Sequence, residues 1–197
     1  MDALRVGVVG AGHMGSYHVA ALAELVDVRL TAVADVDRRR AEDVAGRYGA
    51  AACADAAQLI GQVDAAIVAV PTAQHHKLAR LLLENGVHLL VEKPVCPTVE
   101  EARDLFRLAG RNRLVLHVGH VERFNGAVQE LTRIVRDPTL IECRRLGPFS
   151  PRVQEDGVVL DLMIHDLDIV IRLVDEEIVH LSAVGASVLS DRDDVAS

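Results

Sequence analysis

The sequence predicts an α/β protein in which a doubly wound parallel sheet is followed by a partial α+β region with mostly antiparallel strands. Between residues 4 and 119, short apolar runs alternate with helical segments, as in right-handed β–α–β crossovers. These apolar runs have no polar face, which is typical of strands covered by helices on both sides. The alternation stops near residue 120. We therefore expect one domain over residues 1–120 and the first part of a second domain over residues 121–197.

Each element of the first domain follows from this pattern. The expected strands are residues 4–10, 28–35, 63–70, 87–91 and 113–119. The expected helices are residues 13–25, 36–49, 74–86 and 98–111. Gly49 and Gly86 end two of these helices, because glycine readily adopts the left-handed conformation that follows a helix. Residues 51–61 predict a short strand and a turn of helix.

The region after residue 120 predicts fewer strands. We expect helices at 124–137 and 158–174, a strand at 139–147, a polar loop at 148–157 and one more strand near 177–189. Two or three strands form a marginal sheet on their own. An unpaired strand edge and an uncovered apolar face predict self-association through this region, as a homo-oligomer such as a dimer or tetramer.

Composition excludes several classes of protein. The formal net charge of −8 and the 3% aromatic content argue against nucleic acid as a partner. No apolar run reaches the roughly 20 residues of a membrane helix, and the first residues do not resemble a signal peptide. The three cysteines are far apart and odd in number, which fits reduced thiols and a cytoplasmic protein.

The stretch "GAGHMG" predicts a dinucleotide site of the Rossmann type. Gly10, Gly12 and Gly15 form the pattern G-x-G-x-x-G between a strand and a helix, and His13 and Met14 complete the turn. The three glycines permit a tight turn, close approach of a pyrophosphate and close packing of helix on strand, respectively. The free amides at the helix N-terminus then face the anion. The alternative is a glycine-rich turn without a ligand.

An acidic residue at the end of the second strand predicts the choice of cofactor. Asp35 can accept hydrogen bonds from the adenosine ribose and would repel a 2′-phosphate, which favours NAD over NADP. Arg38 and Arg39 oppose this preference, because an arginine could hold that phosphate.

The strand at 87–91 ends abruptly in charged residues. Glu92 and Lys93 follow the apolar run at once, and Pro94 fixes the direction in which the chain leaves. Ligands bind at the carboxyl ends of parallel strands, so we expect Lys93 beside the nicotinamide, with Glu92 as its partner or as a ribose contact. The alternative is a strand that emerges into water.

The helix at 158–174 predicts a polar face. Asp161 and His165 are four residues apart, and Asp168 follows on the same side. A carboxylate beside an imidazole orients it and raises its basicity, which suits a general base. The alternatives are a solvated polar stripe and a metal site formed by these three residues, although that set is not typical of zinc.

Five stretches in order, "GAGHMG", "AVPTAQHHKLA", "LLENGVHLLVEKP", "VGHVERFN" and "LDLMIHDLDI", resemble the glucose-fructose oxidoreductase/inositol dehydrogenase/MocA family. The resemblance implies a Rossmann domain, a second α/β domain and hydride transfer between nicotinamide and a sugar or cyclitol carbon. It also implies site roles: Lys93 contacts cofactor and substrate, His165 is the acid/base, and Asp161 is its partner. The segment with Pro71, Thr72 and His75 would line the nicotinamide side.

"GHVERFN", "RRLGPFSPR" and "GVVLDLMIHDLDI" resemble most the UDP-N-acetylglucosamine 3-dehydrogenase branch of that family. The implied reaction is oxidation of the sugar C3 hydroxyl. Candidates to hold the substrate are then Arg123, Asn125, Arg145 and Arg152, with a surface position as the alternative for each arginine. Family members continue well beyond residue 197, so we expect a C-terminally truncated chain. Inositol or a free sugar as substrate, and a non-catalytic NAD-binding protein, remain alternatives.

Overall fold

The computed structural model describes residues 3–148 and 153–197, and the chain divides into two compact units, residues 1–119 and 120–197. Within the described part of the first unit, six strands form one sheet in the order β3-β2-β1-β4-β5-β6, and every pair is parallel. The strands are β1 (Leu4–Val9), β2 (Val28–Ala34), β3 (Ala51–Cys53), β4 (Ala65–Val68), β5 (His88–Val91) and β6 (Leu116–Val118). The predicted α/β class is confirmed.

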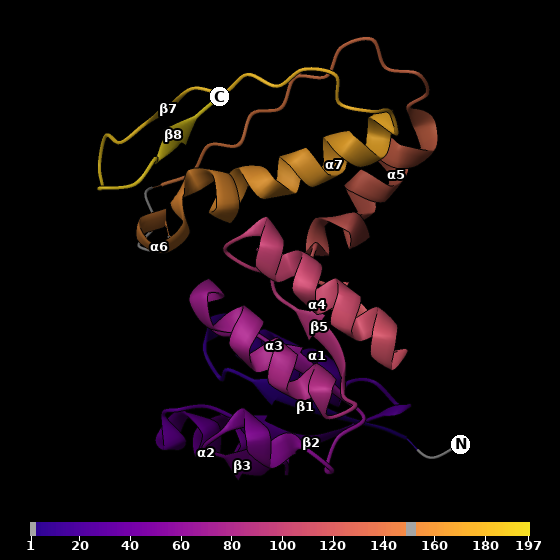
Figure 1. Cartoon of the computed structure of the whole chain (residues 1–197), viewed down its shortest axis with the longest axis vertical. Helices are drawn as coiled ribbons and strands as arrows, with labels where there is room; N and C mark the ends of the chain where they lie inside the picture. The colour runs from indigo at the N-terminus through magenta and orange to yellow at the C-terminus, as the bar shows by residue number, and fades with distance from the viewer. Residues whose placement is uncertain (1–2, 149–152) are drawn as a thin grey trace. The chain divides into compact units, whose positions relative to one another are not determined.

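Helices connect these strands (Figure 1). They are α1 (His13–Ala23), α2 (Arg38–Arg47), α3 (His75–Glu84) and α4 (Val99–Asn112), with 3₁₀ turns at Ala56–Leu59 and Thr72–Gln74. Helix α2 begins later than predicted, because the Asp37 carboxylate accepts hydrogen bonds from the amides of Arg39 and Arg40 and so caps it. Gly49 and Gly86 have φ of 68° and 80° and follow α2 and α3, as predicted.

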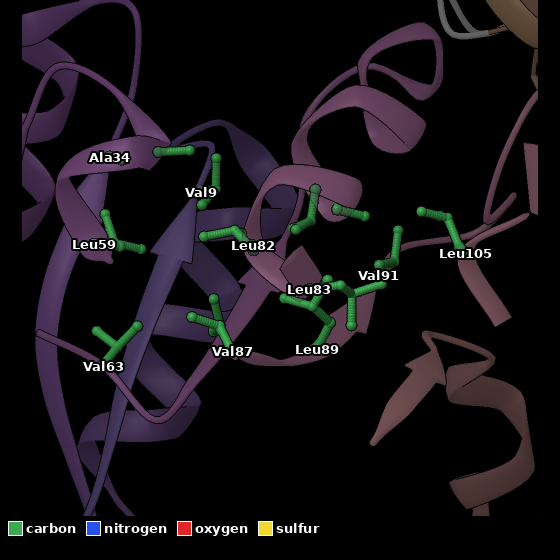
Figure 2. Close-up of a cluster of buried hydrophobic side chains, with 14 of the residues drawn as sticks. Val9, Ala34, Leu59, Val63, Leu82, Leu83, Val87, Leu89, Val91 and Leu105 are labelled. Carbon is green, nitrogen blue, oxygen red and sulfur yellow. The ribbon is translucent and has the colours of Figure 1, made fainter. Parts of the chain in front are cut away.

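Apolar side chains cover both faces of the sheet. Val8, Val19 and Val33 belong to a cluster between the sheet and helices α1 and α2. The larger cluster lies on the other face, beneath α3 and α4, and Leu82 and Leu105 are fully buried in it (Figure 2). Because side chains alternate along a strand, consecutive residues of β1 supply the two clusters. The loops at the carboxyl ends of the strands are therefore mounted on a sheet that is packed on both sides.

The second unit is mainly helical where it is described. It contains a 3₁₀ turn at Val121–Phe124, α5 (Gly126–Ile134), α6 (Val153–Val158), a π-helical turn at Val159–Met163 and α7 (Ile164–Val174). Two short strands, β7 (Gly185–Ala186) and β8 (Val195–Ala196), form an antiparallel pair. No helix in the described residues has the length and hydropathy needed to cross a bilayer.

Two strand predictions in this unit were wrong. Residues 139–147 contain no strand, and the strand expected near 177–189 is reduced to the two residues of β7. A strand persists only where a neighbour pairs its backbone amides and carbonyls, and the described residues of this unit provide one such pair, β7 with β8. The helix expected at 158–174 is also modified, since it opens with the π-helical turn before α7.

Candidate active site

The turn between β1 and α1 is shaped to receive an anion. A Cβ atom on Gly15 would lie 1.7 Å from the carbonyl oxygen of Gly10, so only glycine allows α1 to approach the turn this closely. A Cβ atom on Gly12 would meet nothing within 4 Å, which leaves the backbone open on the ligand side. The two glycines therefore differ in role: Gly15 is needed for packing of α1 on the turn, whereas Gly12 leaves room for a pyrophosphate.

A cavity of about 360 Å³ lies at the carboxyl ends of β1, β2 and β4. Its size is within the range of small-molecule sites. Its walls include Gly10, Gly12, Asp35, Arg40, Pro71 and Lys77. The Asp35 carboxylate is nearly buried and accepts hydrogen bonds from the amide of Ala11 at 2.7 Å and from that of Asp37 at 2.8 Å. A carboxylate fixed beside an open glycine turn fits the ribose and pyrophosphate of a dinucleotide.

Two cations on this cavity were not predicted from the sequence. Arg40 lies with a guanidinium nitrogen 3.8 Å from the Asp35 carboxylate, and Lys77 of α3 also lines the wall. Arg38, which was considered as a phosphate ligand, instead contacts Glu42 at 2.7 Å. The signal that could have found Arg40 is its place in the first turn of α2, close to Asp35. Nothing in the sequence places Lys77 on the wall before the sheet order is known.

The residues predicted to line the nicotinamide side differ in exposure. Pro71 lines the cavity, whereas Thr72 and His75 are buried. His13 is exposed, makes an edge contact with the Tyr17 ring and lines a second hollow of about 340 Å³ beside Gly12. Met14 is partly buried. Contact of these residues with a cofactor stays a prediction.

Glu92, after the end of β5, contacts a partner that was not predicted from the sequence. The carboxylate of Glu92 is nearly buried, and its Oε1 lies 2.6 Å from Nε2 of His18 on α1. Its Oε2 accepts a hydrogen bond from the backbone amide of Lys93 at 3.3 Å. Burial raises the pKa of Glu92, but the hydrogen bond and charge of His18, then those of Lys93, outweigh it, so the pKa lies below its ordinary value. Glu92 is therefore ionised at neutral pH and accepts hydrogen bonds through both oxygens.

In the second unit, the predicted acid/base pair lies at a change of helix type. Asp161 is in the π-helical turn and His165 is the second residue of α7. Such turns are frequent at functional sites. Asp168 binds Arg123 through both carboxylate oxygens, one at 2.8 Å, and this arginine lowers the pKa of Asp168. Because Arg123 uses that carboxylate, Asp168 is a poor candidate for the metal site weighed from the sequence.

The residues predicted to hold the substrate have partners within the second unit. Arg145 binds Asp166 through two nitrogens at 2.8 and 2.9 Å. Asn125 caps α5, since its side chain accepts a hydrogen bond from the amide of Ala127 at 3.0 Å. Arg152 lies outside the described residues. The structure therefore ties Arg123 and Arg145 to acidic residues of α7, and their role in substrate binding stays a prediction.

A parallel sheet in this order, with a glycine-rich turn after its first strand and an acidic residue after its second, defines a dinucleotide-binding protein. Residues 4–120 match the GFO_IDH_MocA domain, described as an oxidoreductase family with an NAD-binding Rossmann fold. The chain belongs to this family, as the sequence motifs indicated.

Curated relatives extend the comparison over almost the whole chain. The chain is 37% identical over 195 residues to UDP-N-acetylglucosamine 3-dehydrogenase of Acidithiobacillus ferrooxidans, covering 98% of the chain and 62% of that protein. It is 30% identical over 199 residues to inositol 2-dehydrogenase of Rhizobium meliloti, covering 96% and 60%. The chain thus spans about three fifths of the length of these relatives.

Solved structures agree with this assignment. The A. ferrooxidans enzyme, GnnA, superimposes with a TM-score of 0.92 at 37% identity, covering all of this chain and 65% of that one. GenD2 from gentamicin A biosynthesis, solved in complex with NAD, superimposes with a TM-score of 0.86 at 25% identity, covering all of this chain and 61% of that one.

Replacing Gly12 with alanine should weaken NAD binding about tenfold or more without unfolding the protein. The new methyl group meets no protein atom but would occupy space where we expect the pyrophosphate to bind, and overpacking a site costs about 1–3 kcal/mol. Gly46→Ala is the matched control, because its Cβ is also unobstructed but lies on α2. Calorimetric titration with NAD measures both. Normal NAD affinity in Gly12→Ala would show that the pyrophosphate binds elsewhere.

Proposed function

We propose that this chain carries the catalytic groups of an NAD-dependent dehydrogenase that oxidises a sugar hydroxyl, most specifically the C3 hydroxyl of a UDP-N-acetylhexosamine. The observation that carries the proposal is the place of Lys93, two residues after the end of β5, at the sheet edge where the cofactor cavity opens after β1, β2 and β4. The similarity to UDP-N-acetylglucosamine 3-dehydrogenase supports the choice of sugar.

Each residue has a distinct role in this proposal. A bound nicotinamide would supply the acceptor for the hydride that leaves the carbon carrying the reacting hydroxyl. His165 removes the hydroxyl proton as general base, and Asp161 orients and strengthens that base. Lys93 holds the hydroxyl oxygen and stabilises the negative charge that develops on it. Asp35 and the glycine turn bind the adenosine ribose and the pyrophosphate.

NADH formation tests the function. The chain is incubated with NAD and UDP-N-acetylglucosamine, and absorbance of NADH is followed while NAD binding is measured in parallel. Turnover with this substrate supports the proposal. NAD binding without turnover on any sugar would favour a non-catalytic NAD-binding protein, and absence of NAD binding would contradict the cofactor site itself.

A second candidate substrate is inositol or a free sugar. It is favoured by the pairing of Arg123 with Asp168 and of Arg145 with Asp166, because arginines engaged in this way leave fewer cations for a diphosphate. Several relatives at about 30% identity are inositol 2-dehydrogenases, in agreement with this alternative. Faster NADH formation with inositol than with the nucleotide sugar would select it.

Asp35 should determine the preference for NAD. Asp35→Ser removes the negative charge that would face a 2′-phosphate, so the ratio of NADP to NAD affinity should rise about tenfold or more. Asp43→Ser is the control, because it removes a carboxylate from the exposed face of α2. Titration of both cofactors decides the outcome. Tighter binding of NADP than of NAD by the unaltered chain would mean that Arg40 dominates over Asp35.

We also propose a cytoplasmic homo-oligomer that assembles through residues after 120. The free cysteines support a reducing compartment. Val179, Leu181, Val188 and Leu189 are largely exposed in the second unit, and exposed apolar residues favour self-association where they gather on one surface.

A further inference from the structure

Lys93 lies between two residues that are each held by a histidine from a different helix. On its N-terminal side, the Glu92 carboxylate contacts Nε2 of His18 at 2.6 Å. On its C-terminal side, the carbonyl oxygen of Pro94 contacts Nδ1 of His75 at 2.9 Å. These contacts join residues that are 74 and 19 positions apart in the chain. All of these residues lie in the first unit, so the contacts are within one compact unit.

The two histidines approach from opposite faces of the sheet. His18 is on α1, which packs in the cluster with Val8 and Val33, whereas His75 begins α3, which packs in the cluster around Leu82. His75 is 1% exposed, and the side chain of His18 is 17% exposed. Because both rings are sheltered from water, their hydrogen bonds to the Glu92 carboxylate and the Pro94 carbonyl hold this segment more firmly than surface contacts would.

His75 joins two of the loops at the carboxyl edge. Its Nδ1 faces the carbonyl of Pro94 after β5, and its Nε2 faces the carbonyl of Val70 after β4 at 2.8 Å. Carbonyl oxygens only accept hydrogen bonds and a neutral imidazole donates through one nitrogen, so the neutral ring hydrogen-bonds one of these carbonyls while its other nitrogen lies beside the second. The loop whose Pro71 lines the cofactor cavity is thereby connected to the loop that carries Lys93.

We propose that His18 and His75 are positioning residues that clamp the Lys93 segment between α1 and α3. The inference rests on the proposed role of Lys93. The clamp acts through Glu92 and the Pro94 carbonyl, so neither histidine needs to touch substrate or cofactor. It gives Glu92 a role other than the ribose contact expected from the sequence, and it gives His75 a role other than lining the nicotinamide pocket.

Paired substitutions test which ring nitrogen matters. The amide nitrogen of asparagine lies near the position of histidine Nδ1, and that of glutamine near Nε2. His75→Asn therefore keeps the donor to Pro94, whereas His75→Gln loses it. For His18 the order reverses, because its contact is through Nε2: His18→Gln keeps the donor and His18→Asn loses it. A role in filling space alone would not reverse the order between the two positions.

Hydrogen–deuterium exchange of residues 92–96 in the full chain is the readout, because it does not depend on turnover. Loss of a buried bond to a charged group or loop should speed exchange there about tenfold to a hundredfold in His18→Asn and His75→Gln. The amides of β1 should remain protected in all four variants. His76→Gln, which changes a histidine bound to Asp104 on α4, is the matched control. Equal exchange within each pair would overturn the clamp.

Nitrogen-15 spectra of the histidine rings in the unaltered protein provide a second test that does not require the variants to fold. The clamp requires a proton on Nε2 of His18 and on Nδ1 of His75. An unprotonated Nδ1 at His75 would overturn its bond to Pro94. If the clamp is present but the chain forms no NADH, the proposed function fails and the clamp stands. If NADH forms while exchange is equal within each pair, the clamp fails alone.

Discussion

Alanine at Lys93 or at His165 should reduce turnover about 10²–10⁴-fold while NAD affinity stays nearly unchanged. Both side chains are assigned to the reacting hydroxyl rather than to the pyrophosphate, and general acid–base catalysis typically contributes a factor of this size. NADH formation and calorimetric titration with NAD measure the two quantities separately. Asp161→Asn should be milder than His165→Ala, because it removes orientation and basicity but leaves the base.

His180→Ala is the control for the histidine, since His180 is an exposed residue of the same unit. It should keep normal turnover. Near-normal turnover in His165→Ala would assign the base to another residue. A large loss of NAD affinity in Lys93→Ala would show that the lysine acts mainly on the cofactor.

Leu82→Ala should destabilise the first unit by about 2–5 kcal/mol, the range for removing a buried leucine side chain. Leu82 is fully buried on α3 and lies in the cluster beneath α3 and α4 (Figure 2). The chain has two tyrosines, Tyr17 and Tyr48, and both are in the first unit. Tyrosine fluorescence during urea unfolding therefore follows that unit.

Leu25→Ala is the matched control, because this leucine is 54% exposed. Its effect should stay within about 0.5 kcal/mol. Equal shifts of the urea midpoint in the two variants would mean that α3 does not form part of the cooperative core.

Much of the first unit could be predicted because its signals are local. Apolar runs such as 63–70 and 87–91 have the length of buried strands, and Gly86 marks the end of α3. The second unit was predicted less well, since residues 139–147 have the composition of a strand but no pairing neighbour in the described residues. Strand formation depends on the partner as well as on the segment, and a partner is not a property of the segment's own sequence.

The residues of the candidate site also differ in how far the sequence could place them. Asp35 and the three glycines were found from spacing, because a strand, a turn and a helix N-terminus suffice to place them. His18 was missed, because its contact with Glu92 joins residues 74 positions apart and depends on how α1 lies across the sheet. The pairing of Arg123 with Asp168 was also not predicted, because it depends on how the turn at Val121–Phe124 lies against α7, and the substrate role of Arg123 stays a prediction.

The hydrogen bond from the Ala11 amide to Asp35 has a consequence for any redesign of this chain to bind NADP in place of NAD. The carboxylate that we propose to reject the 2′-phosphate also accepts a hydrogen bond from the backbone of the glycine turn. Replacing it to admit the phosphate removes that acceptor at the same time. A switch from NAD to NADP should therefore need a second substitution that restores a hydrogen-bond acceptor for the glycine turn. A single substitution at Asp35 should let NADP bind but should weaken the binding of both cofactors.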